Sequence, residues 1–312
     1  MASSLRGRHF IDMKNLSRDE ITAVLDHADE MKRDRNAVRK AAPMFGKTMA
    51  MIFQKPSLRT RVSFETGMTL MGGHAIYLSP NDISLGIRET IEDIAIVLSR
   101  FADVIMARVF GHDIVEGLAK YSRVPVINGL SDAEHPCQIL ADLQTIRERK
   151  HRLEGLTTAF IGDGNNVCVS MMYAGAIVGM NVAVACPAGY EPPQPATDEC
   201  RAIAAKTGAT IRIVREPADA VQNADAVYTD VWASMGQESE AAKRREAFRG
   251  FQVNMALMRQ ARPDAIVLHC LPAHYGEEID YAATRSPNSA IFDEAENRMH
   301  AQNALVAMLC AD

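Results

Sequence analysis

The chain has 312 residues, of which 47% are hydrophobic and 23% charged, and its formal net charge at pH 7 is −5. These are ordinary values for a globular protein with a sizeable core. The acidic balance, together with a sequence that has no long basic run, argues against nucleic acid or an anionic membrane as partner. The length exceeds that of one typical domain, so two domains that share a cleft are expected.

The cysteines and the apolar segments indicate an intracellular protein. The six cysteines form no CxxC pair, so neither a structural zinc site nor a redox dithiol is indicated, and reduced thiols are expected. The first 15 residues are polar and lack the apolar stretch of a signal peptide. The apolar segment 167–187 is interrupted at Gly179, which predicts a buried helix followed by a buried strand instead of a membrane span. We therefore expect a cytoplasmic protein with no membrane partner.

Short apolar, β-rich runs predict strands, and helical stretches of about 10–15 residues lie between most of them. The predicted strands are residues 48–53, 75–78, 103–107, 125–127, 157–161, 181–186, 210–214, 226–229, 265–270 and 290–292. Strands that alternate with helices are typical of parallel sheets covered on both faces. These strands are too many for one sheet of usual width. The sequence therefore predicts an α/β fold of two doubly wound domains, each with a mainly parallel sheet.

A charged stretch at residues 147–155 (RERKHRLEG) interrupts the helix predicted from Ile139 and marks the domain boundary. The first domain is predicted to span residues 1–147 and the second residues 148–295. The polar stretch 235–249 predicts a mobile loop and helix. A final helix, about residues 295–309, is apolar on one face, and its composition leaves open which domain it covers.

The motif FQKPSLRTRVSFE places four polar residues around the start of a predicted helix. Pro56 ends a strand, and Ser57 is a good N-cap for the helix that carries Arg59, Thr60 and Arg61. Backbone N–H groups and the helix dipole favour an anion there, and arginine supplies bidentate donors. A capped helix with solvated arginines fits the same residues.

The motif HPCQILADLQTI places His135 and Gln138 on one face at another helix start. An imidazole can donate to a carbonyl oxygen, and an amide can accept from an NH₂ group. A planar ligand group that carries both a carbonyl oxygen and an NH₂ group needs both functions. The alternative is a simple helix cap.

The motif FIGDGNNVCVSMM reads as strand, glycine turn and helix, the order of a nucleotide-binding crossover. Val167 replaces the third glycine of that fingerprint, and no acidic residue ends the next strand, so dinucleotide binding is only weakly indicated. Asn165 and Asn166 place amide groups at a helix N-terminus, which suits a carboxylate. An Asx turn explains them equally well.

Two further motifs follow predicted strands at the edge where open α/β sheets bind ligands. In TDVWASMGQE, Asp230 and Ser234 can pair with an ammonium group, or can cap the next helix. In HCLPAHYGEEI, Cys270 can be a nucleophile or a plain packing residue. Pro272 removes a backbone donor and turns the chain. The sixth motif, EAENRMH, places Arg298 at the beginning of the final helix, where it reads as a surface arginine.

In this order and over nearly the whole chain, the six motifs resemble those of the ornithine carbamoyltransferases. The resemblance implies that residues 1–147 bind carbamoyl phosphate, that residues 148–295 bind ornithine, and that the C-terminal helix, residues 296–312, returns to the first domain. It implies transfer of the carbamoyl group to the δ-amine of ornithine with no metal or organic cofactor.

The resemblance also implies the role of individual residues. Those matching the carbamoyl phosphate site are Ser57, Leu58, Arg59, Thr60, Ser84, Arg108, His135, Gln138, Cys270, Leu271 and Arg298. Those matching the ornithine site are Asn166, Asp230, Ser234 and Met235. Those closest to the reacting groups are Arg59, Arg108, His135, Cys270 and Asp230.

Two residues depart from the pattern of this family. Leu58 stands where a threonine is usual, and it resembles the N-acetylornithine enzymes. Ser84, in NDISLGIRET, stands where a glutamine or histidine of a neighbouring subunit is common. It is shorter, so a water molecule or Arg88 is the alternative contact to phosphate. A shared site of this kind implies a homotrimer or a multiple of trimers.

Three alternatives remain at this point. N-acetylornithine is the rival acceptor, whereas putrescine and aspartate fit the Asp230 segment less well. A nucleotide-dependent oxidoreductase is suggested by the glycine turn and predicts binding of a nicotinamide dinucleotide. A non-catalytic regulatory subunit predicts binding of carbamoyl phosphate without turnover.

Overall fold

The computed structural model describes residues 5–310 except 84, 87, 235 and 237. The chain divides into two compact units: unit 1 comprises Met1–Gln144 with Glu296–Asp312, and unit 2 comprises Thr145–Ala295. Two helices cross the division along the chain, α7 (Pro136–Lys150) and α14 (Ile291–Cys310). The C-terminal part of α14 thus belongs to unit 1.

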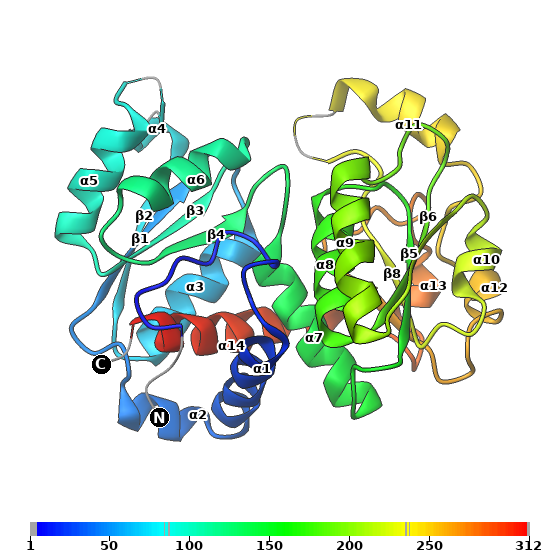
Figure 1. The fold of residues 1–312 in the computed structure, drawn as a ribbon, viewed down its shortest axis with the longest axis horizontal. Helices are drawn as coiled ribbons and strands as arrows, with labels where there is room; N and C mark the ends of the chain where they lie inside the picture. Colours follow the sequence, from blue (N-terminus) through cyan, green and yellow to red (C-terminus); the bar gives the residue numbers. More distant parts are fainter. Residues whose placement is uncertain (1–4, 84, 87, 235, 237, 311–312) are drawn as a thin grey trace. The chain divides into compact units, whose positions relative to one another are not determined.

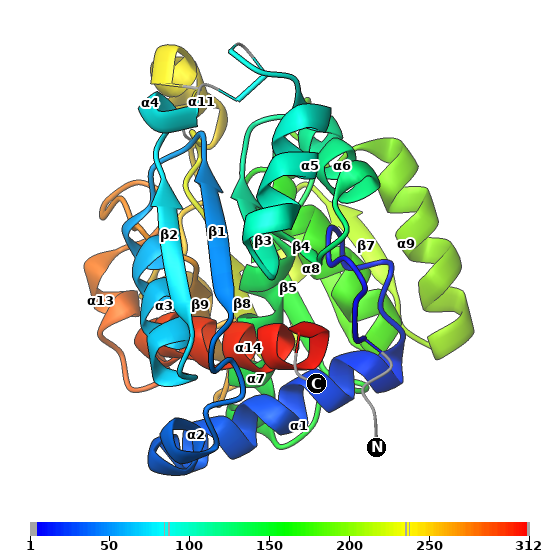
Figure 2. The same cartoon turned by 90° about the vertical axis from the view of Figure 1, so that its left-hand side faces the viewer.

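Unit 1 is built on a four-stranded parallel sheet in the order β2-β1-β3-β4. Its strands are β1 (Thr48–Phe53), β2 (His74–Leu78), β3 (Val104–Arg108) and β4 (Val126–Leu130). Its complete helices are α1 (Arg18–Arg33), α2 (Arg35–Ala41), α3 (Leu58–Leu70), α4 (Pro80–Ile83), α5 (Ile91–Phe101) and α6 (His112–Tyr121). Figures 1 and 2 show α5 and α6 on one face of this sheet, and α3 with the end of α14 on the other.

Unit 2 is built on a five-stranded parallel sheet in the order β7-β6-β5-β8-β9. Its strands are β5 (Thr157–Ile161), β6 (Asn181–Ala185), β7 (Ile211–Val214), β8 (Ala226–Thr229) and β9 (Ile266–His269). Its helices are α8 (Asn166–Val178), α9 (Gln194–Thr207), α10 (Pro217–Val221), the 3₁₀ helix η1 (Glu238–Glu240), α11 (Ala241–Ala247), α12 (Met255–Met258) and α13 (Tyr281–Thr284). In Figure 1, α8 and α9 lie on one face of the sheet, and α10, α12 and α13 lie on the other. The predicted fold class is confirmed.

Helix starts coincide with the capping residues of the sequence. The Ser57 hydroxyl accepts the backbone N–H of Thr60 at 3.3 Å before α3. The Asn165 amide oxygen accepts two backbone N–H groups at 3.0 and 3.1 Å before α8, and α8 ends where Gly179 adopts a φ of 80°. Satisfying the otherwise unpaired N–H groups fixes where each helix begins. Both helices therefore begin just past the carboxyl end of a central strand.

The apolar segment 167–187 forms α8 and then β6, as predicted. Residues 167–178 of α8 are all buried, and β6 is buried from its second residue onward. Within the described ranges, no helix combines the length and the apolar character that spanning a bilayer requires.

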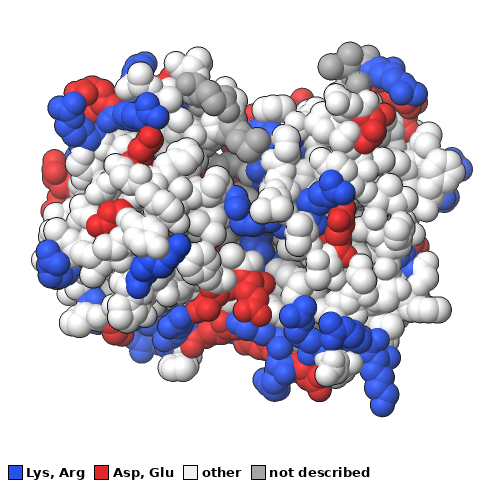
Figure 3. All heavy atoms as spheres, turned by 180° about the vertical axis from the view of Figure 1, so that it is seen from behind, with Lys and Arg blue, Asp and Glu red and all other residues white. Residues whose placement is uncertain are grey.

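Basic side chains gather on unit 1 where α1 gives way to α2, at the lower edge of the face drawn in Figure 3. The last turns of these two helices carry Lys32, Arg33, Arg39 and Lys40. Cations are stabilised at the negative end of a helix dipole. The dipoles of these two helices therefore favour the positive charges found here.

The final predicted strand, residues 290–292, is wrong, because α14 already begins at Ile291. The residues just before the helix make a single bridge to β9, from Ser289 to Val267. Ala290 and Ile291 are almost fully buried. A short buried apolar run gives the same pattern in a strand and in the first turn of a helix.

Helix α7 also differs from the prediction, since it continues into the charged stretch 147–155 and ends within it, at Lys150. Its last turn is basic, which the helix dipole favours. Arg298 lies about two turns inside α14, not at its beginning, and only 3% of it is exposed. The predicted mobile segment 235–249 contains η1 and α11 in its described part.

Gly67 lets α14 approach α3 closely, and its replacement tests that packing. A Cβ at Gly67 would lie 2.0 Å from the Oδ1 atom of Asn303, which is 2% exposed and has little room to move. We expect Gly67→Ala to lower the free energy of unfolding by about 1–3 kcal/mol, measured by urea denaturation.

The matched background is Asn303→Ala, which removes the clashing atom. In that background Gly67→Ala should become neutral or stabilising by up to ~1 kcal/mol, because alanine favours helix more than glycine does. Equal destabilisation in both backgrounds would contradict the packing argument.

Candidate active site

In unit 1, the predicted anion-binding residues follow the carboxyl ends of neighbouring strands. β1 and β3 pair so that Phe53 lies beside Arg108, and Arg108 in turn lies beside Leu130 of β4. The strand order reverses between β1 and β3, because β1 leads to β2 on one side and β3 leads to β4 on the other. Open parallel sheets bind ligands at such a switch point.

The N-terminus of α3 lies at this edge of the sheet. Ser57 caps it and also donates from its hydroxyl to Thr60 Oγ1 at 3.1 Å. Thr60 is 1% exposed, whereas the side chain of Leu58 is turned outward and the residue is 74% exposed. The departure at Leu58 therefore leaves the helix cap intact. The first turn of α3 presents N–H groups and the positive end of the dipole, an arrangement that favours an anion.

His135 is buried directly before α7 among arginines. Only 5% of it is exposed, and its carbonyl oxygen accepts the N–H of Gln138 at 3.0 Å. Burial first, and then the charges of Arg298, Arg108 and Arg59, hold the pKa of His135 well below its ordinary value of 6.5. The structure thus gathers one neutral imidazole and three guanidinium groups in one region of unit 1.

Gln138 and Arg298 form one hydrogen-bonded chain in this region. Arg298 donates to Gln138 Oε1 at 2.5 Å and to Thr60 Oγ1 at 3.5 Å. The Gln138 amide nitrogen donates to Asp142 at 2.8 Å. All four side chains are at most 3% exposed. The direction of the Gln138 amide is therefore fixed, with its oxygen toward Arg298.

In unit 2, a second set of residues meets at the switch point between β5 and β8. These strands pair so that Ile161 lies beside Thr229, and Asp230 follows directly. One carboxylate oxygen of Asp230 accepts from the Asn165 amide at 2.8 Å, and the other accepts from the Cys270 thiol at 3.0 Å. Asp230 therefore joins the segments that follow β5, β8 and β9.

The other predicted residues of unit 2 lie nearby in sequence. Asn166 is half-buried, and its Oδ1 atom accepts the N–H of Val167 at 3.0 Å. Ser234 is half-buried in the segment after Asp230. Leu271 directly follows Cys270 and has a φ of 58°. Met235 lies outside the described residues, as does Ser84 of unit 1.

Two groups of described residues have the composition of a metal site, with ligand atoms within 4.8 Å of one another. They are Asp230, His269 and Cys270, and His274, Glu277 and Glu278. Both ring nitrogens of His269 already contact Leu271 and Glu278, and Glu277 pairs with Arg245 at 2.9 Å. A cation would have to displace these contacts, so the residues fit a polar network better than a metal centre.

Two supporting residues, Asp142 and Arg244, were missed by the sequence interpretation. Asp142 orients Gln138 from one helical turn away, a spacing that the motif itself contains. The Asn165 amide, which the sequence interpretation placed beside Asn166 at the helix start, contacts Asp230. Arg244 of α11 donates to Asp163 and to the carbonyl of Trp232, each at 2.8 Å. Arg244 and Asp163 lie far apart in sequence, and no local pattern links them.

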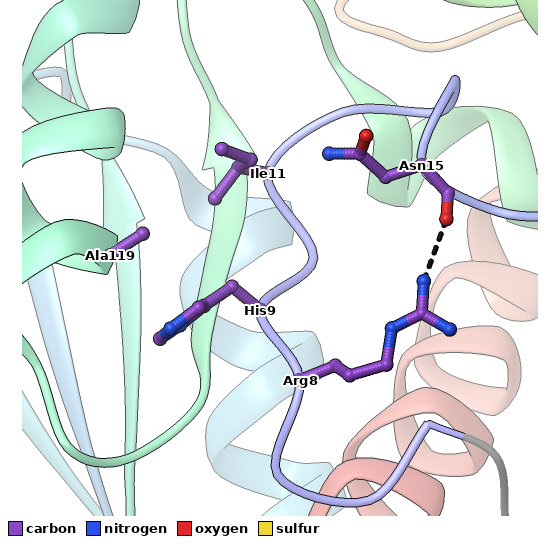
Figure 4. A pocket seen from close by; sticks show the side chains of 5 residues that line it. All are labelled: Arg8, His9, Ile11, Asn15 and Ala119. Carbon is purple, nitrogen blue, oxygen red and sulfur yellow. Dashed lines mark hydrogen bonds between the residues drawn. The ribbon is translucent and has the colours of Figure 1, made fainter.

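A pocket of about 330 Å³ in unit 1 lies away from these residues. Figure 4 shows its lining, which consists of Arg8, His9, Ile11, Asn15 and Ala119. Arg8 donates to the Asn15 carbonyl at 2.7 Å, and His9 Nδ1 accepts the N–H of Val126 at 3.1 Å. Burial lowers the pKa of His9, consistent with a neutral ring. Its polar groups hold the N-terminal segment in place.

Two family models match the chain. Residues 8–148 match the aspartate/ornithine carbamoyltransferase carbamoyl-P binding domain, and residues 154–309 match the Asp/Orn binding domain of the same family.

Relatives match over the full length. Ornithine carbamoyltransferase of Thermococcus kodakarensis is 52% identical over 309 residues, which cover 99% of this chain and 98% of that protein. The anabolic ornithine carbamoyltransferase of Pyrococcus furiosus is 50% identical with the same coverage.

Solved structures show the same similarity. Ornithine carbamoyltransferase from Pyrococcus furiosus superposes with a TM-score of 0.96 at 50% identity and covers 99% of both chains. The Gloeobacter violaceus enzyme gives 0.88 at 41% identity and covers 98% of this chain and 99% of its own. The resemblance inferred from the motifs is confirmed, and the chain belongs to the aspartate/ornithine carbamoyltransferase family.

Proposed function

We infer that this chain is an ornithine carbamoyltransferase, which transfers the carbamoyl group of carbamoyl phosphate to the δ-amine of L-ornithine and yields L-citrulline and phosphate. The observation that carries this conclusion is the full-length identity of about half with proteins named for that activity. The assay that tests it is citrulline formation from carbamoyl phosphate and ornithine. The acceptors N-acetylornithine, putrescine and aspartate are compared in parallel, and turnover of N-acetylornithine alone would overturn the choice of ornithine.

Carbamoyl phosphate is assigned to residues 1–147, completed by residues 296–312. The support is the N-terminus of α3 together with the guanidinium groups around His135. The phosphate is held by the capped first turn, with Ser57, the Leu58 backbone and Thr60. Arg59 and Arg108 neutralise its charge. Arginine suits this role because its planar fork matches phosphate oxygens and stays charged.

The carbamoyl group is assigned to His135, Gln138 and Arg298 of unit 1 and to the backbone carbonyls of Cys270 and Leu271. A neutral His135 donates its one N–H to the carbonyl oxygen. The Gln138 oxygen, already directed by Arg298, accepts from the carbamoyl NH₂. A donor aimed at an oxygen that becomes an oxyanion stabilises the transition state more than the ground state.

Ornithine is assigned to residues 148–295, through Asn166, Asp230, Ser234 and Met235. Asp230 carries a carboxylate at the ligand-binding edge of the sheet, where it suits an ammonium group. The δ-amine attacks the carbamoyl carbon as a neutral nucleophile, a tetrahedral oxyanion forms, and phosphate leaves. These residues supply positioning and charge stabilisation, so the mechanism routes no step through a metal or cofactor.

The cellular role and the assembly are finer proposals. The name of the Pyrococcus furiosus relative includes the word anabolic, which supports a role in arginine synthesis. We also propose a cytoplasmic homotrimer or multiple of trimers, in which Ser84 of a neighbouring subunit faces the phosphate. The support for the trimer is the position of Ser84 in the family pattern. Sedimentation of the purified chain tests the number of subunits.

Arg59 is tested against Arg61 of the same helix. Arg59→Ala should lower kcat by roughly 10²–10³, because it removes a donor from the developing charge. Arg61 instead pairs with Glu65 at 3.0 Å on an exposed face. Arg61→Ala should leave kcat nearly unchanged in the citrulline assay. Equal losses in the two variants would contradict the assignment of Arg59.

The control for Asp230 is Asp225. Asp225 directly precedes β8, whereas Asp230 directly follows it, so the two carboxylates lie at opposite ends of the same strand. Asp230→Asn removes the charge for the ornithine ammonium, so KM for ornithine should rise about 10-fold or more, while KM for carbamoyl phosphate changes little. Asp225 accepts the N–H of Thr157 at 2.9 Å, so we assign it a structural role and no role in ornithine binding. Asp225→Asn should affect stability and spare KM. A normal KM for ornithine in Asp230→Asn would refute the assignment.

The neutral state of His135 predicts a pH dependence of stability. Because folding lowers its pKa, the unfolded chain binds the proton more readily, and stability is lost as pH falls below about 6.5. His135→Gln should therefore lose less free energy of unfolding between pH about 7.5 and 5.5 than the wild type does, measured by urea denaturation. A larger loss in the variant would show that His135 is protonated in the folded state.

A further inference from the structure

A buried polar network organises the turn that follows β9. His269 and Glu278 are both 0% exposed. The Nδ1 atom of His269 accepts the backbone N–H of Leu271 at 2.8 Å, and Nε2 lies 3.1 Å from Glu278 Oε1. The same carboxylate oxygen accepts the backbone N–H of His274 at 2.5 Å.

These contacts fix the tautomer of His269. A backbone N–H can only donate, so Nδ1 must present its lone pair to Leu271. The ring proton therefore sits on Nε2 and donates to Glu278, which accepts as a carboxylate. Were the proton on Nδ1, two donors would face each other at 2.8 Å and the contact with Leu271 would be lost.

The network closes the turn at both ends. Glu278 holds the ring of His269 before the turn and the N–H of His274 after it. The N–H of His269 is held in addition by Glu294 at 2.8 Å. Leu271, between them, has a φ of 58°, a conformation that costs a branched residue energy and persists where the surroundings impose it. Its N–H is the backbone group that His269 holds.

We propose that His269 and Glu278 are positioning residues: Glu278 sets the His269 tautomer, and the imidazole fixes the Leu271 peptide so that the carbonyls of Cys270 and Leu271 are aimed at the carbamoyl NH₂. The proposal rests on the proposed function, which assigns that ligand to the turn. Backbone carbonyls cannot be replaced by mutation, but their direction depends on these two side chains. A displacement of about 1 Å is enough to cost roughly 10²-fold in rate.

Two amide substitutions separate the two halves of the histidine. In His269→Asn, the amide oxygen can take the place of Nδ1 and accept from Leu271, while the donor to Glu278 is lost. In His269→Gln, the longer amide can reach Glu278, while the acceptor for Leu271 is lost. We expect His269→Gln to lower kcat by about 10- to 100-fold and His269→Asn to lower it much less.

Glu278 provides the conservative rescue. Glu278→Gln keeps an oxygen that can accept from both His269 and His274, and should stay within about threefold of the wild-type kcat. Glu278→Ala removes that oxygen and should behave like His269→Gln. The stability control is Tyr173→Phe, which removes a hydroxyl contact to Glu199 between α8 and α9 and should leave kcat unchanged.

Three measurements decide the outcome: kcat for citrulline formation, inhibition by inorganic phosphate, and hydrogen exchange of the peptide that contains Leu271. The proposal predicts that His269→Gln lowers kcat and speeds exchange at Leu271, while phosphate inhibition stays as in Tyr173→Phe. Normal kcat or normal exchange in His269→Gln overturns it. A loss of phosphate inhibition in that variant shows general unfolding, and the Glu278 variants then decide the outcome.

The failure of the proposed function has a separate signature. A wild-type chain that forms no citrulline refutes that function, whereas the exchange at Leu271 needs no turnover. If His269→Gln does not fold, the comparison of Glu278→Gln with Glu278→Ala carries the test. Exchange or kcat that changes equally in Glu278→Gln and Glu278→Ala would show that the retained oxygen does not position the turn.

Discussion

One imidazole buried among three guanidinium groups is the constraint on which unit 1 depends. Arg59, Arg108 and Arg298 keep their protons at any physiological pH, so their charge is permanent. His135 stays neutral among them. Protonation would add a further positive charge where little water can screen it, so its pKa is lowered. The first turn of α3 contributes potential of the same sign. The stabilising ligand for such a region is an anion, and the carboxyl ends of β1 and β3 supply the place where these groups can meet.

Unit 2 uses the same sheet geometry with charge of the opposite sign. Asp230 follows β8 at the switch point, and its two oxygens take one donor from the segment after β5 and one from the segment after β9. A carboxylate whose two oxygens each accept a hydrogen bond is fixed in direction. Arg244 and Asp163, buried as a pair, tie α11 to the turn after β5. Burial raises the pKa of Asp163, and the guanidinium opposes that shift. The two units thus present opposite charges from the same kind of edge.

The sequence predicted the sheets well because parallel strands buried on both faces are short apolar runs, and β1, β5 and β8 have the predicted bounds. It failed at residues 290–292, where burial alone does not distinguish a strand from a first helical turn. The motifs located Ser57, His135 and Asp230 because capping and strand ends are local features. They could not place Arg298, which the sequence suggested was a surface arginine. In the structure, α14 brings it into contact with Gln138 and Thr60. Nor could they reveal the Arg244 pair, whose partners meet only through the tertiary fold.

The turn after β9 shows why some functional residues have no chemical signature of their own. Where a ligand is held by backbone carbonyls, as proposed for Cys270 and Leu271, the side chains at those positions specify little of the contact. What the sequence must encode is the direction of the peptide groups, and the proposal assigns that task to the buried His269 and Glu278. Each of them looks like a candidate catalyst or metal ligand when read alone. Their partners show otherwise, since both ring nitrogens of His269 and one oxygen of Glu278 are committed to holding the chain. Some residues of a motif such as HCLPAHYGEE can therefore act by positioning the backbone, and not by contacting the ligand.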